Sequence, residues 1–430
     1  MRRPGAGAEL EVAVGDLGSG GDGIAESEAG RIYLPGALPG ERWRVRLVGA
    51  LGEGWRGEPL ACLSPARRAE PVCPHFGACG GCRLQHLLEG PYVAFKRRRI
   101  VDALARRGLA TTAVDNPKVA PLGSRRRVRL GIARGDGKLV LGLRRRGSHR
   151  LEPLTACPVA EPALVAMLPP LARALDAALA RPWPAEASLT LAANGLDLLL
   201  HGARPPTATE RRSLPRLADD LDLARIGWDR GERGTLEPLV VRRLPMVELA
   251  GVPVELPIGA FLQATRFGEA CLSEAVVGWS EGSRHAVDLF AGLGTLTFPL
   301  ARRVRRVRAF ESDPAAIGAL KRAAGGSGLG HVVATVRDLE RRPLTPPELA
   351  GCDLVVLDPP RAGAAAQAAI LARSAVPRLI YASCQPESFA RDARLLVDGG
   401  FDLVELRPID QFRFSAEVEL IALFARQKRS

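Results

Sequence analysis

The sequence contains no apolar run that approaches the roughly 20 residues needed to cross a membrane. The nearest region, Leu164–Ala180, is interrupted by two prolines and by charged residues. The first ten residues, MRRPGAGAEL, lack the apolar core of a secretory signal peptide. Eight cysteines in 430 residues do not resemble the disulfide framework of a small secreted protein. These absences predict a cytoplasmic protein with reduced thiols and no membrane partner.

Acidic residues are fewer than basic ones: the chain has 47 Asp and Glu and 60 Lys and Arg, which gives a formal net charge of +13. Such an excess favours a polyanionic partner, since basic side chains bind phosphates and release counterions. The alternative is an arginine-rich composition spread over every surface. With 47% hydrophobic residues, a chain of this length is expected to form two or three domains.

The first domain is expected at residues 1–62, where short strand-like runs alternate with glycine turns. Leu10–Val14, Gly30–Leu34 and Arg42–Val48 have the composition of strands, and Gly15–Gly23 has that of a flexible loop. This spacing predicts a small β-barrel. Barrels of this kind often bind oligonucleotides, although others are inert domains.

A central domain is expected at residues 63–255, which begin with a segment rich in Pro, Gly and Cys. An apolar stripe predicts a helix over Val93–Arg107. Any single basic cluster is explained by a solvated face, but three clusters close together favour an RNA track. The three clusters are Lys96–Arg99, Arg125–Arg127 and Arg144–Arg146.

A third domain is expected at residues 256–430, where apolar strands alternate with helical stretches. This order predicts an open α/β sheet with a largely parallel core. Ligands bind at the carboxyl ends of the strands in such sheets, so the residues that follow the strands are the candidates for a site. The expected strands are Ala286–Phe290, Val307–Glu311, Val332–Val336, Leu354–Leu357, Leu379–Ala382 and Val418–Phe424.

The first of these strands runs into a turn that contains Gly292 and Gly294. Glycines let the backbone turn sharply and approach a ligand closely. The third glycine of a dinucleotide fingerprint is missing, because the sequence continues Thr295–Leu296–Thr297. The turn therefore predicts a ligand site but weighs against a nicotinamide enzyme.

Acidic residues accompany four successive strands. Asp288 precedes the glycine turn, Glu311 ends the second strand and Asp338 follows the third. A carboxylate at the second position can bind both hydroxyls of a ribose, and Asp338 is placed to contact an adenine amino group. Each acid alone is explained by a turn or a cap, but together they predict a site for an adenosine-bearing ligand. Asp358 is held at the fourth strand end by two following prolines, unless these are an ordinary stop.

Three further residues are candidates for the reaction itself. Cys384 leaves a strand just before a helix that begins after Pro386, and a helix N-terminus lowers the pKa of a thiol. Cys271 and Cys352 lack this setting and are interpreted as structural. Glu417 and Glu419, two residues apart on a strand, are expected to point to the same side, where like-charge repulsion would raise one pKa. If that end of the strand is exposed to solvent, the two glutamates are merely a solvated pair.

Cys73, Cys79 and Cys82 form a Cys-x5-Cys-x2-Cys pattern with intervening glycines. Three thiolates are an incomplete site for tetrahedral zinc or for an iron–sulfur cluster. Cys157 is the best candidate for the fourth ligand, and His75 could instead complete a zinc site. The spacing alone does not separate the two metals.

Together these residues resemble the RNA uracil-5-methyltransferase family over nearly the whole chain. The Gly18–Gly23 loop and Pro39–Gly40–Glu41 resemble the TRAM barrel of many members. The resemblance implies an N-terminal barrel that binds RNA, a central α+β domain with a [4Fe-4S] cluster, and a Rossmann-like class I methyltransferase domain that uses S-adenosylmethionine. The implied cluster ligands are Cys73, Cys79, Cys82 and Cys157.

The resemblance also implies the roles of the site residues. Ser383–Cys384–Gln385–Pro386 is similar to the nucleophile motif, and Glu419 falls on the base. Phe261–Leu262–Gln263 is similar to the segment that opens the catalytic domain. The implied cofactor-binding residues are Gln263, Asp288, Phe290, Gly292, Gly294, Thr295, Glu311, Asp338 and Asp358.

The implied reaction explains the need for a cysteine. Carbon 5 of uracil is too weak a nucleophile to attack a methyl sulfonium unaided. Addition of a thiolate at carbon 6 generates an enolate, which makes carbon 5 reactive. A base must then remove the proton from carbon 5, so that the thiol can leave.

Three departures from the family pattern leave alternatives open. The family often has asparagine where Thr295 and Asp338 stand, and commonly histidine where Glu417 stands. Glu417 could therefore assist or replace Glu419, which we prefer as the base. Because members with a cluster mostly modify large-subunit ribosomal RNA, we expect 23S ribosomal RNA as the substrate. We also expect a monomer. Transfer RNA, another base, a protein substrate, or a noncatalytic RNA-binding or assembly protein are the alternatives.

Overall fold

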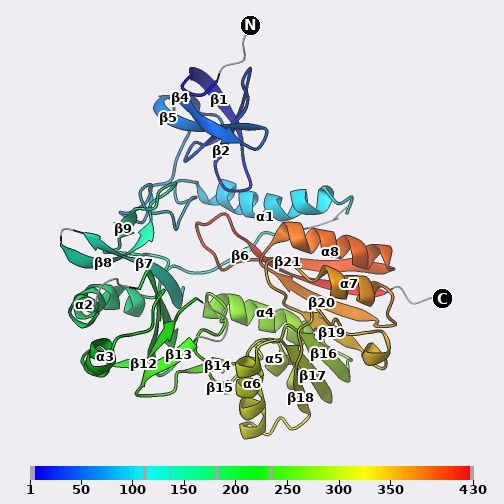
Figure 1. Ribbon diagram of the computed structural model, residues 1–430. Coiled ribbons are helices and arrows are strands. Elements are labelled where there is room, and N and C mark those ends of the chain that lie inside the picture. The colour runs from blue at the N-terminus through cyan, green and yellow to red at the C-terminus, as the bar shows by residue number, and fades with distance from the viewer. Residues whose placement is uncertain (1–4, 110–113, 136, 180–183, 232–235, 427–430) are drawn as a thin grey trace.

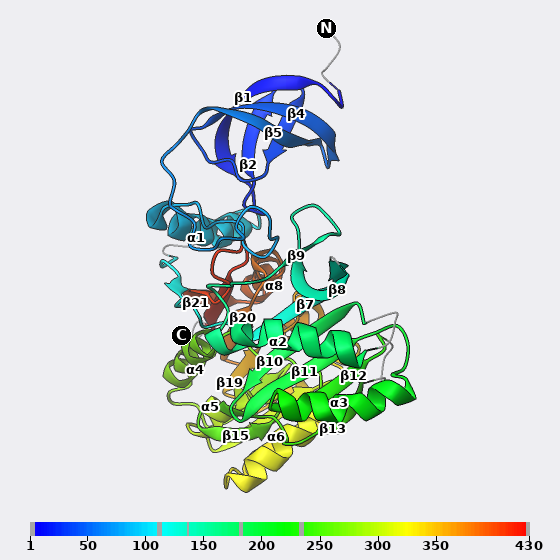
Figure 2. The same ribbon diagram turned by 90° about the vertical axis from the view of Figure 1, so that its left-hand side faces the viewer.

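The computed structural model describes residues 5–109, 114–135, 137–179, 184–231 and 236–426 of the chain. A small barrel stands at one end of the molecule, and two sheets with their helices lie beyond it (Figures 1 and 2). A single helix, α1 (Glu89–Ala105), runs between the barrel and the C-terminal sheet. No helix in the described ranges is long and apolar enough to span a bilayer.

The N-terminal barrel is closed by five strands in the order β1-β2-β3-β5-β4, which confirms the small barrel expected there. Apolar residues alternate with exposed ones along β1 and β4, as expected for strands with one face toward a core. Val14, Ile32 and Leu47 lie at the centre of this core. The strands are β1 (Glu9–Leu17), β2 (Gly23–Ser27), β3 (Gly30–Leu34), β4 (Arg42–Leu51) and β5 (Gly54–Ser64).

A seven-stranded sheet follows, in the order β13-β12-β11-β10-β7-β8-β9. Two helices, α2 (Pro162–Ala178) and α3 (Ala208–Asp220), pack on it through a leucine-rich core. The strands are β7 (Arg127–Gly135), β8 (Lys138–Arg144), β9 (Leu151–Pro153), β10 (Glu186–Ala192), β11 (Gly195–His201), β12 (Leu223–Asp229) and β13 (Leu236–Val241). A two-stranded ribbon, β14 (Met246–Leu249) and β15 (Val252–Glu255), leads into the C-terminal part.

The C-terminal sheet has the strand order β18-β17-β16-β19-β20-β22-β21-β6. Its first five strands are parallel, whereas β22 runs antiparallel to β20 and β21. The chain order therefore reverses between β16 and β19, which makes the carboxyl ends of these two strands the expected ligand crevice. The strands are β6 (Lys118–Val119), β16 (His285–Leu289), β17 (Arg306–Glu311), β18 (Val332–Val336), β19 (Leu354–Leu357), β20 (Arg378–Ser383), β21 (Phe401–Asp410) and β22 (Glu419–Arg426).

Helices cover both faces of this sheet, so its central strands are buried throughout. Val355 and Leu357 pack against the helices of one face, and Leu354 and Val356 against those of the other, as the two-residue period of a strand requires. The helices are α4 (Arg266–Trp279), α5 (Thr297–Ala301), α6 (Pro314–Gly326), the 3₁₀ turn η1 (Pro347–Leu349), α7 (Ala365–Ala372) and α8 (Pro386–Asp398).

Helix α1 corrects the interpretation of the first basic cluster. Lys96 is fully buried, and its Nζ donates to Asp410 Oδ1 at 2.7 Å. Arg99 is also buried and donates to Glu387 Oε1 at 2.9 Å. The prediction of an exposed RNA track is therefore wrong for these two residues, because they fasten α1 to the C-terminal part.

The second basic cluster is corrected in the same way. Arg126 is 2% exposed and donates to the carbonyl of Gln263 and to the carboxylate of Glu269 on α4. A buried arginine with a carboxylate partner stabilises the packing of the two parts of the chain rather than presenting charge to RNA.

Candidate active site

The glycine turn lies at the carboxyl end of β16, as predicted. The backbone is left-handed at Phe290, Gly292 and Gly294, with φ of 63°, 53° and 100°. Gly294 is required there for space as well, because a Cβ would lie 2.5 Å from the ring of Phe298. The turn meets the next strand directly, since the amide of Gly292 donates to Glu311 Oε2 at 3.1 Å. The predicted turn and Glu311 therefore form one continuous edge of the crevice.

Asp288 is buried beneath this turn. Its Oδ2 accepts a hydrogen bond from Thr297 Oγ1 at 2.5 Å, whereas Oδ1 has no partner among the described residues. Burial raises the pKa of Asp288 to about 7, with smaller contributions from the charges of Asp358 and Glu311. A buried acceptor without a partner is costly, so the crevice is better satisfied when a ligand or water donates to it.

Asp338 and Thr295 are placed less directly. Asp338 follows β18, but its Oδ1 accepts from the amides of Glu340 and Arg341 in the turn that follows. These bonds are those of an ordinary turn residue. Thr295 is half-buried in the loop before α5. The described contacts join neither residue to Asp288 or Glu311.

Two acids at this edge are linked by a chain of buried amides. Gln263 Nε2 donates to Asp358 Oδ2 at 3.1 Å. Gln411 Nε2 donates both to Gln263 Oε1 at 2.9 Å and to Glu419 Oε2 at 3.0 Å. Gln263, Gln411 and Glu419 are each 2% exposed. The chain connects the carboxyl end of β19 with the start of β22.

Glu419 and Cys384 lie at adjacent strand ends, because Ser383 of β20 pairs with Leu420 of β22. Burial raises the pKa of Glu419 to about 8, and the charge of Asp358 adds to this shift. Glu419 is therefore largely protonated at neutral pH and gains its charge just above it.

The predicted pKa shift of the Cys384 thiol is wrong. Burial raises its pKa to about 12, the charges of Glu419 and Asp358 raise it further, and Arg361 opposes them. The thiol lies just before Gln385, which precedes the first residue of α8, and the helix end does not outweigh these effects. In the protein alone the thiol is protonated, and any positive charge that binds nearby shifts it toward the thiolate.

The expectation that Glu417 and Glu419 share one side of a strand is also wrong. The strand β22 begins only at Glu419, and Glu417 lies in the preceding loop. Its carboxylate forms an ion pair with Arg361 at 2.7 Å, and its side chain is 37% exposed. The raised pKa of Glu419 comes from burial and Asp358, not from repulsion by Glu417.

A cavity of about 440 Å³ lies beside these groups. Arg361, which faces the Cys384 thiol, and Gln385, its neighbour in the chain, line its wall. The other lining residues come from the barrel loop, the cysteine-rich segment, α1 and the C-terminal loop: Ser19, Gly20, Gly80, Gly81, Arg83, Arg99, Glu387, Ser415, Ala416 and Glu417. The cavity thus lies where the barrel, the cysteine-rich segment, α1 and the C-terminal loop meet.

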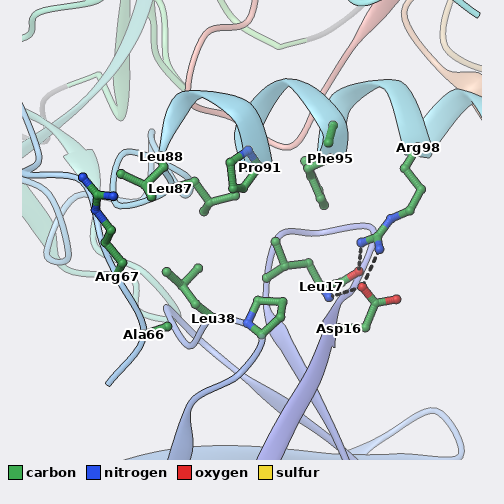
Figure 3. A pocket seen from close by; sticks show the side chains of 12 residues that line it. Asp16, Leu17, Leu38, Ala66, Arg67, Leu87, Leu88, Pro91, Phe95 and Arg98 are labelled. Atoms are coloured by element: carbon green, nitrogen blue, oxygen red, sulfur yellow. Dashed lines mark hydrogen bonds and ion pairs between the residues drawn. The ribbon is translucent and has the colours of Figure 1, made fainter. Parts of the chain in front are cut away.

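A second cavity, of about 300 Å³, lies on the barrel side of α1 (Figure 3). Its wall is mainly apolar, with Leu17 and Leu38 from the barrel opposite Phe95 of α1. Arg98 at its edge is paired with Asp16 at 2.6 Å. Neither cavity is lined by Cys384 or Glu419 themselves. The first is lined by Gln385, the neighbour of Cys384 in the chain, and by Glu417, so we place the active site beside the first cavity.

The four predicted cysteine ligands gather in one place. Burial raises the pKa of Cys79, Cys82 and Cys157, and the charges of neighbouring thiols in this set of four add smaller contributions. All four are free thiols. No group of three or more His, Cys, Asp or Glu side chains in the described part of the chain is close enough to hold a metal ion.

His75 does not point to this cluster. Its Nδ1 shares a hydrogen bond with Glu152 Oε1 at 3.0 Å, and its Nε2 shares one with Thr155 Oγ1 at 2.9 Å. With both ring nitrogens engaged, His75 is a poor candidate for the fourth zinc ligand.

Sequence relatives decide the family. No family model matches the chain. A Caulobacter vibrioides protein named as an uncharacterized RNA methyltransferase is 42% identical over 427 residues, which cover 97% of this chain and 100% of that protein. The chain belongs to this family of RNA methyltransferases. An Edwardsiella ictaluri 23S rRNA (uracil(1939)-C(5))-methyltransferase is 33% identical over 426 residues, which cover 96% of this chain and 95% of the relative.

A solved structure confirms the fold of this RNA methyltransferase. The Pyrococcus abyssi tRNA (uracil-54, C5)-methyltransferase, in complex with S-adenosyl-L-homocysteine, superposes with a TM-score of 0.77 at 22% identity. The match covers 96% of this chain and 99% of the other. The chain therefore has the fold of that tRNA methyltransferase along nearly its whole length.

Gln411 is one residue of this buried network that was not predicted from the sequence. It joins Gln263 to Glu419 and directly follows β21, a strand that we did not predict. The only signal was a polar amide that follows an apolar strand, which is common at any strand end.

Proposed function

We propose that this RNA methyltransferase methylates carbon 5 of a uridine through a covalent bond from Cys384. The observation that carries the proposal is the arrangement of a half-buried thiol and a buried carboxyl, Glu419, at adjacent strand ends beside a cavity lined with arginines. A noncatalytic RNA-binding or assembly protein needs neither a thiol nor a buried acid at this edge.

The residues of the crevice fit the methyl donor. Glu311 lies against the glycine turn at the end of β17, where ribose hydroxyls are commonly bound. The unpaired Oδ1 of Asp288 offers an acceptor at the same edge. We assign the cofactor to Asp288, Glu311, Asp358, Gln263 and the turn from Phe290 to Thr295, with Asp338 at the periphery. When bound, S-adenosylmethionine supplies an electrophilic methyl group and a positive charge.

The reaction divides between Cys384 and Glu419. The Cys384 thiol loses its proton to water, and Sγ bonds as the thiolate to carbon 6 of uracil while the electron pair of the carbon 5–carbon 6 double bond moves toward carbon 5 and the oxygen on carbon 4. Carbon 5 then takes the methyl group, whose bond to the donor sulfur breaks and leaves a neutral thioether. The Glu419 carboxylate removes the remaining proton from carbon 5, the double bond re-forms, and the bond between sulfur and carbon 6 breaks.

The cavity is the place where the target nucleotide enters. Arg83 and Arg361 present guanidinium groups that suit phosphates. The Ser19–Gly20 loop lets the barrel contribute to the same wall, which supports an RNA-binding, TRAM-like role for it. Because the Edwardsiella relative is named for uracil 1939 of 23S ribosomal RNA, we propose 23S ribosomal RNA as the substrate. Transfer RNA is the second candidate.

The proposed reaction is tested with purified protein, unmodified 23S RNA transcript and S-adenosylmethionine that carries an isotopically labelled methyl group. We expect label in 5-methyluridine when the RNA is digested to nucleosides and analysed by mass spectrometry. Transfer RNA transcript is the parallel substrate. Label on another base or on protein would contradict the proposal.

We further propose that Cys73, Cys79, Cys82 and Cys157 hold a [4Fe-4S] cluster. Charge interactions among the thiols place them in one region of the structure, although no group of three or more His, Cys, Asp or Glu side chains in the described ranges is arranged to hold a metal ion. Four cysteine thiolates are the donor set of a [4Fe-4S] cluster and also of a tetrahedral zinc site. The resemblance to cluster-bearing uracil methyltransferases favours the cluster, with a structural or RNA-docking role.

Anaerobic purification is expected to give a brown protein with about four irons per chain. Cys82→Ser should lose the colour and most of the iron, because one thiolate ligand is missing. Cys62→Ser is the matched control, since Cys62 is an exposed thiol on the barrel. Iron analysis and visible absorption make the measurement. A colourless protein with one zinc per chain would refute the cluster.

A further inference from the structure

The buried amide of Gln411 has a role that the two-residue mechanism does not supply. Its Nε2 donates to two acceptors at once, Gln263 Oε1 and Glu419 Oε2. The first acceptor belongs to a residue that also donates to Asp358. Gln411 is thus the single described link between the cofactor edge of the sheet and the proposed base.

The protein makes room for this amide at Gly268 on α4. A Cβ at Gly268 would lie 2.6 Å from Gln411 Oε1 and 2.9 Å from Gln411 Cβ. Gln411 Oε1 itself has no hydrogen-bond partner among the described residues. The side chain is therefore oriented by the two bonds of Nε2 and by the close contact with the glycine.

We infer that Gln411 is a positioning residue that holds the Glu419 carboxylate in line for proton removal from carbon 5. The inference rests on the proposed function and deepens it, because it assigns the release step to a pair of residues. The hydrogen bonds of Gln411 Nε2 go to Gln263 and Glu419, so Gln411 acts through Glu419.

The charges around Glu419 explain why a donor is needed. Asp358 lies just after β19 and Cys384 just after β20, and the ionised form of either group opposes a second negative charge on Glu419. The hydrogen bond from Gln411 is the interaction that favours the ionised form, and it lowers the pKa of Glu419 against these effects. Without it, the carboxyl stays protonated to a higher pH and loses its orientation.

The test compares Gln411→Met with the wild-type protein. Methionine has a similar length but no hydrogen-bond donor. Labelled S-adenosylmethionine and RNA with ordinary uridine are mixed in a single turnover. Label is then counted in the denaturation-resistant protein–RNA complex and in free RNA. We expect methyl transfer into the complex to change within about threefold, whereas release slows by about tenfold or more. Release should recover as pH rises.

Two further variants separate positioning from folding. Gly268→Ala should slow release in the same way, because the new methyl group displaces the amide. Gln367→Met removes another buried amide, which binds the backbone of Leu344 at 2.8 and 3.1 Å away from the site. This control should lower thermal stability without slowing release relative to methyl transfer.

The outcomes distinguish this inference from the proposed function. If wild-type protein forms 5-methyluridine and folded Gln411→Met releases it at the wild-type rate and pH profile, the positioning role is overturned. If the Gln411→Met protein does not fold, release by the Gly268→Ala protein is measured instead. The same criterion then applies: release at the wild-type rate and pH profile overturns the positioning role. If wild-type protein yields neither 5-methyluridine nor a labelled complex, the proposed function itself fails.

Discussion

Cys384→Ala is expected to lower methyl transfer to uridine by a factor on the order of 10⁴ or more, because the residue supplies the bond that activates carbon 5. No denaturation-resistant complex with RNA should form. Cofactor binding should remain within a few fold of wild type, since Asp288 and Glu311 lie on β16 and β17, away from the substituted side chain. Nucleoside mass spectrometry and equilibrium binding of the cofactor measure the two effects.

Cys271→Ala is the matched control for this variant. Cys271 is a half-buried free thiol on α4 in the same part of the chain. It should retain methyl transfer, because the residue lies outside the proposed site. Near-normal turnover by Cys384→Ala, or a complex that persists in it, would rule out Cys384 as the nucleophile.

Glu419→Gln is expected to trap the enzyme on its own product. The thiol can still add to uracil and carbon 5 can still be methylated, but the proton on carbon 5 has no base to accept it. A methylated complex should therefore accumulate with ordinary uridine, and release should slow by about 10²–10⁴. Gel separation under denaturing conditions, followed by counting of label, measures the trapped fraction.

The rate of release measured against pH is a second test of the role of Glu419. Glu419 acts as a base only when ionised, and its pKa is raised to about 8. Release by wild-type protein should therefore rise with pH through this value, and Glu419→Gln should lose this dependence. Glu417→Gln is the control, since Glu417 is paired with Arg361 and outside the buried network. If the methylated complex accumulates in Glu417→Gln and release is normal in Glu419→Gln, then Glu417 is the base and Glu419 is not.

The alternation of strands and helices was sufficient to predict the C-terminal sheet and to place Cys384 at a strand exit. Local patterns carry that information, because strand period and turn residues are properties of neighbouring positions. The antiparallel strand β21 was missed, since its burial pattern is irregular and its partner β22 is the last strand of the chain. The strand β6 joins the same sheet from a position nearly 300 residues earlier, which no local pattern reveals.

Properties that depend on burial could not be predicted in the same way. Cys384 lies just before a helix, as expected, yet its pKa is raised, because burial and two carboxyls from other strands outweigh the helix end. Lys96 belongs to a basic run that suggests exposed charge, but Asp410, more than 300 residues later, accepts its hydrogen bond inside the protein. Such effects follow from tertiary contacts, which the sequence alone does not specify.

The role of Cys384 is tested by locating the bond between protein and RNA. RNA that carries 5-fluorouridine is incubated with the protein and S-adenosylmethionine, then both polymers are digested and the joined fragment is sequenced by mass spectrometry. A base can remove hydrogen from carbon 5 as a proton, but it cannot remove fluorine in this way. The bond between Cys384 and carbon 6 therefore does not break after methyl transfer. We predict a methylated fluorouridine joined to the peptide at Cys384. A fragment joined at another residue, or methylated RNA without any joined peptide, would contradict covalent catalysis by Cys384.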